Sequence, residues 1–421
     1  MTGILKLSLK ELKKKKFFSF LMLVVCTVAM HTVISSITNA ASTTYQQMIF
    51  ENNMSYELDT VLHLDYQYTE ETSEFTEVLA QYRAYISSLN GVKAVGMLDV
   101  AGTYFSELND SADYQMINAG IVAGSIYENY PAQAQLLCVD ESLLGLVAGG
   151  ISAYSQSSDG RLPIYASELF KRVLPMGMTL TDDRTGAQYE IMGYVPTGSK
   201  WIDENDLIRF PMVSMDGWFI APFTTENEAD IMTQLSCLHN TYILLSENSD
   251  VVYLKQAITS YPEQHGFKAT AYTLAEEYDV YHEETEAFVT RQIGLAVFIS
   301  VMAISSIAAV FTTNTLLKGK QYGILLANGY TQSDITVGIA TEIGIIVFFS
   351  AILSWAAKLV EFERSVDPFR IVLLEAHIRY TLPICTLLTI ALIGIATLLP
   401  SIRVFKYQPC ELIGGDHHGT Y

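Results

Sequence analysis

The sequence predicts a membrane protein with four transmembrane α-helices and a large α+β extracytoplasmic domain between helices 1 and 2. Two observations predict this fold class. Half of the 421 residues are hydrophobic and only 17% are charged. In addition, four apolar runs each reach the roughly 17–25 residues that a bilayer-spanning helix needs. The runs are Phe17–Ile37, Ile293–Phe311, Ile335–Ala357 and Tyr380–Leu399.

The apolar runs and the polar residues beside them divide the whole chain into segments. In chain order the predicted segments are a cytoplasmic amphipathic basic helix (1–16), TM1 (17–38), an extracytoplasmic α+β domain with stalk segments at both ends (39–286), TM2 (287–316), a cytoplasmic coupling loop (317–334), TM3 (335–357), an extracytoplasmic loop (358–379), TM4 (380–400) and a cytoplasmic tail (401–421). The first and second spans therefore enclose most of the polar sequence.

Basic residues orient these spans. They cluster before the first run, after the second and after the fourth, at Lys13–Lys16, Lys318 with Lys320, and Arg403 with Lys406. An excess of Lys and Arg beside membrane helices marks the cytoplasmic side. Both termini and the loop between the second and third spans are therefore expected to be cytoplasmic.

The N-terminal run has two interpretations. Ala40-Ala41-Ser42 has the small residues of a signal-peptide cleavage site, but the run is longer than the roughly 7–15 residues of a signal core, which favours an uncleaved span. Upstream, leucines and lysines fall on separate helical faces, at Leu5, Leu9 and Leu12 and at Lys6, Lys10 and Lys13. This pattern is typical of a helix lying on anionic lipid. A simple positive stop signal is the alternative.

The segment after the first run alternates helix and strand patterns. Glu77–Leu89 places apolar residues at helical spacing, and Asn90-Gly91 has the composition of a helix C-cap. A strand is expected next, at Val92–Val100. The other expected elements are a hairpin of Met178–Leu180 and Tyr189–Val195 around the turn-rich Asp182–Gly186, strands at Trp218–Ala221 and Thr241–Leu245, a helix at Val251–Tyr261 and an exposed loop at Ser152–Gly160. Together these elements predict an α+β domain.

The flanks of the outer segment read as helical extensions of the spans. Asn39–Phe50 and Ala275–Arg291 contain neither Pro nor Gly, and Pro in particular breaks helices. We therefore expect spans one and two to continue outward as a paired stalk, which would convert movement in the membrane into movement outside it.

The charge of the chain is strongly negative, with a formal net charge of −20. In the outer segment, acidic residues far outnumber basic ones. Such a surface favours encounter with cations, cationic peptides included. Solubility of an extracytoplasmic domain is the simpler explanation of the same composition, because charges beyond a Debye length are largely screened.

The five cysteines and the histidines show no metal-ligand spacing, so no metal site is predicted. Cys138 and Cys237 both lie in the outer segment, but the sequence alone leaves open whether they pair. His417-His418 reads as part of a tail. Motifs of hydrolytic enzymes are also missing: the sequence contains no GxSxG and no HExxH.

The loop between the second and third runs and the end of the chain carry a recognisable series of residues. The series is Gly323-Ile324-Leu325, Ala327, Gly329 and Ile335, followed by Glu342 and later by Pro400, Arg403, Pro409, Glu411 and Leu412. In this order and with four spans, the chain resembles FtsX-like ABC-transporter permeases. Leu89–Val95, Pro163–Leu180 and Tyr189–Val195 resemble parts of the outer domain of the macrolide-exporter (MacB-like) type.

The resemblance implies a permease subunit in the bacterial plasma membrane whose inner loop is a coupling helix. The implied coupling residues are Lys320, Gln321, Tyr322, Gly323, Ile324, Leu325, Leu326, Ala327, Asn328 and Gly329. They would dock on an ABC ATPase subunit and transmit its movement to the outer domain, an action called mechanotransmission. Gln321 and Leu326 depart from the family pattern, which usually has an acid and an Arg there.

The composition of the inner loop supports docking independently. Ile324–Ala327 is apolar and too short to bury itself, so a protein partner explains it well. An interfacial hairpin lying on lipid is the alternative. Because no GxxxxGK[ST] loop occurs, this chain is expected to bind no cofactor, to be no enzyme itself, and to lack a fused ATPase domain. ATP and Mg would be bound by the partner.

Further expected partners are a second permease copy or paralogue, membrane lipid and an extracytoplasmic adaptor protein, with no nucleic acid. Polar residues within the spans fit close helix contact, at Thr27, His31, Thr32, Ser300, Ser305 and Ser306. Glu342 must be paired, protonated or turned toward protein. Lys318 and Lys320 are its candidate partners, and packing is favoured over a transport or proton role.

Export or detoxification of a peptide or hydrophobic compound is the leading functional hypothesis. A second hypothesis is a regulatory transducer that switches an extracellular partner, such as a cell-wall hydrolase, without transport. Lipoprotein release shares the layout, and an orphan ectodomain receptor with no ATPase is a further alternative. Altered efflux on deletion would favour export, and a cell-separation defect would favour the transducer.

Overall fold

The computed structural model describes two compact units of the chain. The described residues are 10, 12–53, 57–67, 75–123, 128–147, 151–157, 159–202, 212–225, 230–265, 267–364 and 370–406. One unit, the helical unit, comprises Met1–Tyr45, Thr285–Ser365 and Arg370–Tyr421. The other, the sheet unit, comprises Gln46–Glu284 with Val366–Phe369. Most of the basic segment 1–16, the tail from 407 and Cys410 lie outside the described residues.

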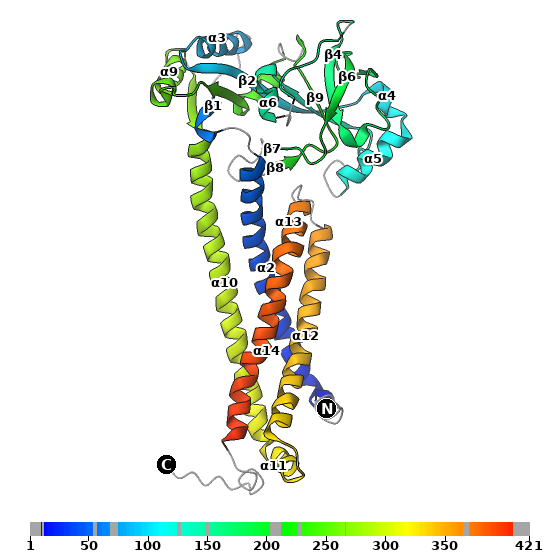
Figure 1. Ribbon diagram of the computed structural model, residues 1–421, viewed down its shortest axis with the longest axis vertical. Helices are drawn as coiled ribbons and strands as arrows, with labels where there is room; N and C mark the ends of the chain where they lie inside the picture. The colour runs from blue at the N-terminus through cyan, green and yellow to red at the C-terminus, as the bar shows by residue number, and fades with distance from the viewer. Residues whose placement is uncertain are drawn as a thin grey trace. The chain divides into compact units, whose positions relative to one another are not determined.

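The helical unit consists of long helices joined by short ones (Figure 1). They are α2 (Lys16–Asn53), α10 (Leu274–Leu317), α11 (Gly319–Ala327), α12 (Gln332–Arg364), α13 (Arg370–Ala376), the π-helical η4 (His377–Thr381) and α14 (Leu382–Phe405). Four stretches are long and apolar enough to cross a membrane: Lys16–Asn52, Leu274–Leu317, Gln332–Arg364 and Leu373–Ile402. The chain is therefore a multi-pass membrane protein by helix length and composition.

Residues expected in a loop at 358–379 are largely helical among those described. Helix α12 continues from the apolar run to Arg364, and α13 begins at Arg370. Lys358–Arg364 contains Lys, Leu, Glu and Arg, which are good helix formers, and neither Gly nor Pro. The end of an apolar run therefore does not mark the end of this helix.

Apolar side chains fill the interior of the helical unit, and small hydroxyl residues bring helices close together. The buried cluster includes Cys26, Ile307, Phe311, Ile343 and Val347. On α12, Ser350 Oγ donates to the carbonyl of Leu23 (3.2 Å) and Ser354 Oγ to that of Thr27 (2.9 Å). Interhelical hydrogen bonds from small residues are a common means of packing membrane helices.

The sheet unit is built on one mixed sheet of nine strands (Figure 1). In spatial order the strands are β11 (Lys268–Thr273), β1 (Val61–Gln67), β10 (Thr241–Leu245), β2 (Val92–Thr103), β3 (Ala134–Val139), β9 (Trp218–Ala221), β4 (Leu162–Ser167), β6 (Gln188–Val195) and β5 (Thr179–Thr181). The pairs β3–β9 and β4–β6 are parallel and the others are antiparallel. A separate pair joins β7 (Lys200–Ile202) to β8 (Met212–Ser214).

Short helices connect and cover these strands. They are η1 (Leu58–Thr60), α3 (Phe75–Ser87), α4 (Ser106–Asn109), α5 (Ala112–Val122), α6 (Glu141–Val147), η2 (Glu168–Phe170), α8 (Ile231–Ser236), η3 (Cys237–His239) and α9 (Val251–Gln264). Helices α3 and α9 cover one end of the sheet, with Tyr82, Leu254 and Ile258 buried against Ile243. A second core lies farther along the sheet around Phe219.

Most secondary structure expected for the outer segment is confirmed. Helix α3 begins two residues earlier than expected, and Gly91 behind it adopts a φ of +99°, which a Gly C-cap favours. The hairpin is β5–β6, and strands β9 and β10 have the expected limits. Cys138 and Cys237 are two buried thiols rather than a disulfide.

Candidate functional site

The inner loop folds as a short helix with sharply defined ends. Helix α10 stops at Leu317, and Lys318 is the N-cap of α11. At the other end Gly329 has a φ of +90°, and its N–H donates to Leu326 O. Such a left-handed Gly terminates helices efficiently.

A capping box starts the next helix immediately afterwards. The Thr331 N–H donates to the Asp334 carboxylate (2.9 Å), and the Asp334 N–H donates to Thr331 Oγ1 (3.1 Å). This reciprocal pairing satisfies donors that a helix N-terminus otherwise leaves unpaired. The segment from Lys318 to Asp334 is therefore a defined helix–turn rather than an extended loop.

Helix α11 has one face on the helical core and one face exposed. Tyr322 and Leu326 pack against the buried cluster, and Gly323 is buried. Ile324 is 46% exposed. Of the other predicted coupling residues, Leu325 is half-buried, and Lys320, Gln321, Ala327, Asn328 and Gly329 are exposed. Ile324 and its polar neighbours are thus accessible to solvent, while Tyr322, Gly323 and Leu326 pack against the helical unit.

A buried ion pair fixes the start of α11. Lys318 Nζ lies 2.9 Å and 3.1 Å from the two carboxylate oxygens of Glu342 on α12, and both side chains are almost fully buried. Of the two lysines that the sequence offered as partners, Lys318 makes this contact and Lys320 is exposed. Nearby, Lys15 donates to Asn314 of α10. Because Lys318 is also the N-cap residue of α11, the ion pair links the start of α11 to α12.

In the sheet unit, the end of α2 and the start of α10 hold each other. Phe50 stacks on Tyr278, with ring centroids 5.1 Å apart. Gln47 Nε2 donates to Tyr278 Oη (3.0 Å) and lies 2.7 Å from His282 Nδ1, and Tyr278 Oη donates to Glu51 (2.5 Å). The two expected stalk segments are therefore continuous helices that contact each other at this end.

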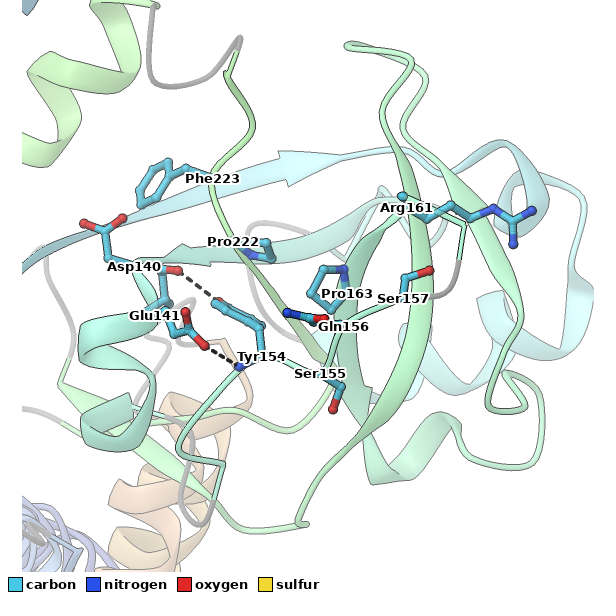
Figure 2. Close-up of a pocket in the computed structure, with 12 residues that line it drawn as sticks. Asp140, Glu141, Tyr154, Ser155, Gln156, Ser157, Arg161, Pro163, Pro222 and Phe223 are labelled. Carbon is cyan, nitrogen blue, oxygen red and sulfur yellow. Dashed lines mark hydrogen bonds between the residues drawn. The ribbon is translucent and has the colours of Figure 1, made fainter.

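An open cleft of about 470 Å³ lies in the sheet unit (Figure 2). It lies at the carboxyl ends of the parallel strands β3 and β9, a frequent location of ligand sites. Tyr154 occupies its centre: its hydroxyl donates to Val139 O (2.9 Å) and its N–H donates to Glu141 (3.2 Å). Burial raises the pKa of the Tyr154 phenol, so that phenol stays neutral.

The polar groups around the cleft mainly brace its walls. Asp140 accepts the Met97 N–H (2.8 Å), and Ser157 donates to Glu190. Among the described residues there is no group of three His, Cys, Asp or Glu side chains placed to hold a metal ion. The sequence indicated an exposed loop at Ser152–Gly160 and did not reveal that Tyr154 folds back from it to line a cleft.

Comparisons with known proteins find likenesses among solved structures only. No protein-family model and no curated protein matches the sequence. The periplasmic region of MacB from Actinobacillus actinomycetemcomitans is similar, with 11% identity, a TM-score of 0.34, and coverage of 54% of this chain and 95% of that one.

Two further solved structures show weaker likeness. The extracellular domain of the noncanonic ABC-type transporter YknZ from Gram-positive bacteria has 13% identity and a TM-score of 0.31, with coverage of 50% of this chain and 97% of that one. A heavy metal efflux pump has 8% identity and a TM-score of 0.16, with coverage of 85% of this chain and 36% of that one. The first two domains are thus aligned over nearly their full lengths, against about half of this chain.

Proposed function

We propose that this chain is the membrane subunit of an FtsX-like, macrolide-exporter-type ABC transporter. Helix α11 is the observation that carries the proposal. It is a short helix with an exposed Ile324, and its first turn is anchored by the buried Lys318–Glu342 pair. The resemblance of Gly323-Ile324-Leu325, Ala327 and Gly329 to the coupling segment of that family supports the same role.

Movement of α11 has a continuous route through the molecule. Lys318 joins α11 to the end of α10, which runs unbroken for 44 residues from Leu274 to Leu317. At 1.5 Å per residue such a helix is roughly 66 Å long. Its first turns belong to the sheet unit, where Tyr278 contacts α2. ATP-driven displacement at one end of α10 would therefore reach the sheet.

The complete transporter requires other subunits. A separate ABC ATPase would bind ATP and Mg and perform the hydrolysis, and a second permease copy or paralogue would complete the dimer. The protein would lie in the bacterial plasma membrane with both termini cytoplasmic. Export or detoxification of a peptide or hydrophobic compound, with an adaptor protein, is the proposed outcome of the movement.

A regulatory transducer is the second candidate function. The apolar packing between the helices is in keeping with it, because Ile307, Phe311, Ile343 and Val347 fill the interior of the helical unit with apolar side chains. The phenotype of a strain in which the gene is deleted distinguishes the two candidate functions. Increased drug or peptide susceptibility with reduced efflux supports export, whereas a cell-separation defect with unchanged efflux supports the transducer.

Nucleotide-dependent movement is the central test. The chain is purified with its ATPase, and spin labels are placed at the exposed Ser88, directly after α3, in both permease copies. We expect the distance between the labels to change between the nucleotide-free complex and the complex trapped with ATP. Identical distances in the two states, with the ATPase bound, would contradict mechanotransmission.

Membrane orientation is tested by thiol labelling in intact cells. Cys410 is replaced by Ser, and single cysteines are introduced at the exposed Ser152 and Gln332. A membrane-impermeant maleimide should label Ser152→Cys in intact cells and Gln332→Cys only after permeabilisation. The other four cysteines are buried, so the parent protein serves as the blank. The reverse labelling pattern would invert the proposed orientation.

A further inference from the structure

A buried histidine in the sheet unit makes two hydrogen bonds to acceptors. His63, on β1, is 2% exposed. Its Nδ1 lies 2.8 Å from Oε1 of Glu277 on α10, and its Nε2 lies 2.7 Å from the backbone carbonyl of His239. The ring also stacks on Tyr242, its neighbour on β10. These contacts join the second strand of the sheet to the first turn of the long helix.

This arrangement fixes the number of protons that the pair must hold. A carbonyl can only accept, so Nε2 must donate to His239. The contact between Nδ1 and Glu277 then needs one more proton, on either atom. Without that proton, a ring nitrogen lone pair faces a carboxylate oxygen. The bonded geometry therefore exists only while His63 and Glu277 share one titratable proton.

The surroundings penalise loss of the proton further. The other carboxylate oxygen of Glu277, Oε2, is buried and has no hydrogen-bond partner among the described residues. The titratable groups that face His63 are Glu277 on α10, Asp65 on β1, His239 on η3, Tyr242 on β10 and Tyr272 on β11. His239 Nδ1 is bonded to Asp65 (2.6 Å), so the His239 side chain is engaged away from Glu277.

Burial of the ring opposes its charged form, but the hydrogen bond and the negative charge of Glu277 outweigh burial and raise the pKa of His63 above 6.5. A group with a raised folded-state pKa stabilises the fold fully below its unfolded-state pKa. That contribution is lost as pH rises through the raised value. The contact is therefore strong below the ordinary pKa of 6.5 and weakens as the pH rises through the raised pKa of His63.

We propose that His63 and Glu277 form a proton-dependent clamp that fixes the start of α10 to the sheet. In this proposal His63 and Glu277 are positioning residues. Movement of α10 reaches the sheet only while the first turn of α10 is attached to β1. This role rests on the proposed function, in which the sheet unit is extracytoplasmic and the external pH sets the strength of attachment. The clamp itself is a property of the sheet unit and is testable without any ATPase.

Hydrogen exchange in the full-length protein in nanodiscs measures how firmly the clamp holds the first turns of α10. The readout is the protection factor of backbone amides at 278–281, which corrects for the intrinsic pH dependence of exchange. Above the pKa of the clamp, protection should fall about tenfold per pH unit, because opening is linked to one proton. Below that pKa, protection should be constant.

Two substitutions distinguish the effect of the proton from the effect of side-chain packing. In Glu277→Gln, the amide can donate to Nδ1 of neutral His63 while Nε2–H still donates to His239. This variant should keep its protection at high pH and show a flat profile. In His63→Gln, one side chain cannot reproduce both bonds, so protection should be low at every pH.

A neighbouring ion pair provides the matched control. Lys255 on α9 binds Glu276, the residue before Glu277, at a more exposed position. Lys255→Met should retain the wild-type pH slope. A wild-type slope in Glu277→Gln would overturn the clamp, and so would a flat profile in the wild type.

The transmission role has its own readout. In the complex with the ATPase, the movement of the Ser88 labels should diminish at alkaline pH in the wild type and persist in Glu277→Gln. A pH-dependent exchange profile with pH-independent movement would overturn the positioning role and leave the proposed function intact. Absence of movement at every pH would instead count against the proposed function, while the exchange profile would still decide the clamp.

Discussion

Replacing Ile324 by Asp should uncouple the ATPase while the protein still inserts and folds. The Ile324 side chain is 46% exposed on α11, so an acid there is solvated in the isolated chain. In the complex the same acid would be buried against the partner. Loss of a central interface residue typically costs about 2 kcal/mol or more, or about 30-fold in affinity. Binding titrations with the purified ATPase measure this change.

Ser333→Asp is the control for that substitution. It adds the same charge to the same inner segment, at an exposed position in the first turn of α12. An acid is favourable there because of the helix dipole. Ser333→Asp should therefore bind the ATPase normally. Equal loss of binding in the two variants would show that charge, rather than the α11 face, weakens docking.

Breaking the Lys318–Glu342 pair should have the largest effect on the helical unit. Lys318→Met leaves the Glu342 carboxylate buried without its cation. Removal of one partner from a buried pair typically costs about 3–5 kcal/mol, whereas replacement of both partners by apolar residues costs far less. The double variant Lys318→Met with Glu342→Leu should therefore recover most of the thermal stability that the single variant loses.

The same variants separate stability from coupling. The double variant should fold and bind the ATPase, yet show weaker nucleotide-driven movement, because a directional ion pair between α11 and α12 is replaced by apolar contact. Thermal unfolding in detergent and the Ser88 label distances measure the two properties. If the double variant is destabilised by the sum of the two single effects, the two side chains do not act as a pair.

The sequence predicted the features that depend on local pattern. The four long helices follow from apolar runs, and the helical character of 39–50 and 275–291 follows from the lack of Pro and Gly. Helix α3 and the β5–β6 hairpin follow from spacing and turn residues. The segment 358–364 was assigned to a loop because charge begins there, although its residues favour a helix.

Contacts between distant residues were beyond the same reasoning. Glu342 required a partner, but a choice between Lys318 and Lys320 needed the position of the break between α10 and α11. His63 and Glu277 are 214 residues apart and meet only through the pairing of β1 in the sheet. Tyr154 lines the cleft because its hydroxyl returns to Val139, a contact that no local pattern specifies.

The unbroken length of α10 constrains how this protein can vary. Each residue of an α-helix turns the next by about 100°. One added or missing residue between Glu277 and Lys318 would swing one of these side chains a quarter-turn or more away from its partner. A change of seven residues, close to two full turns, would restore the rotation but change the length of the helix by roughly 10 Å. The number of residues between Glu277 and Lys318 therefore determines the angle about the helix axis between their side chains. The identity of the apolar side chains between them does not change this angle.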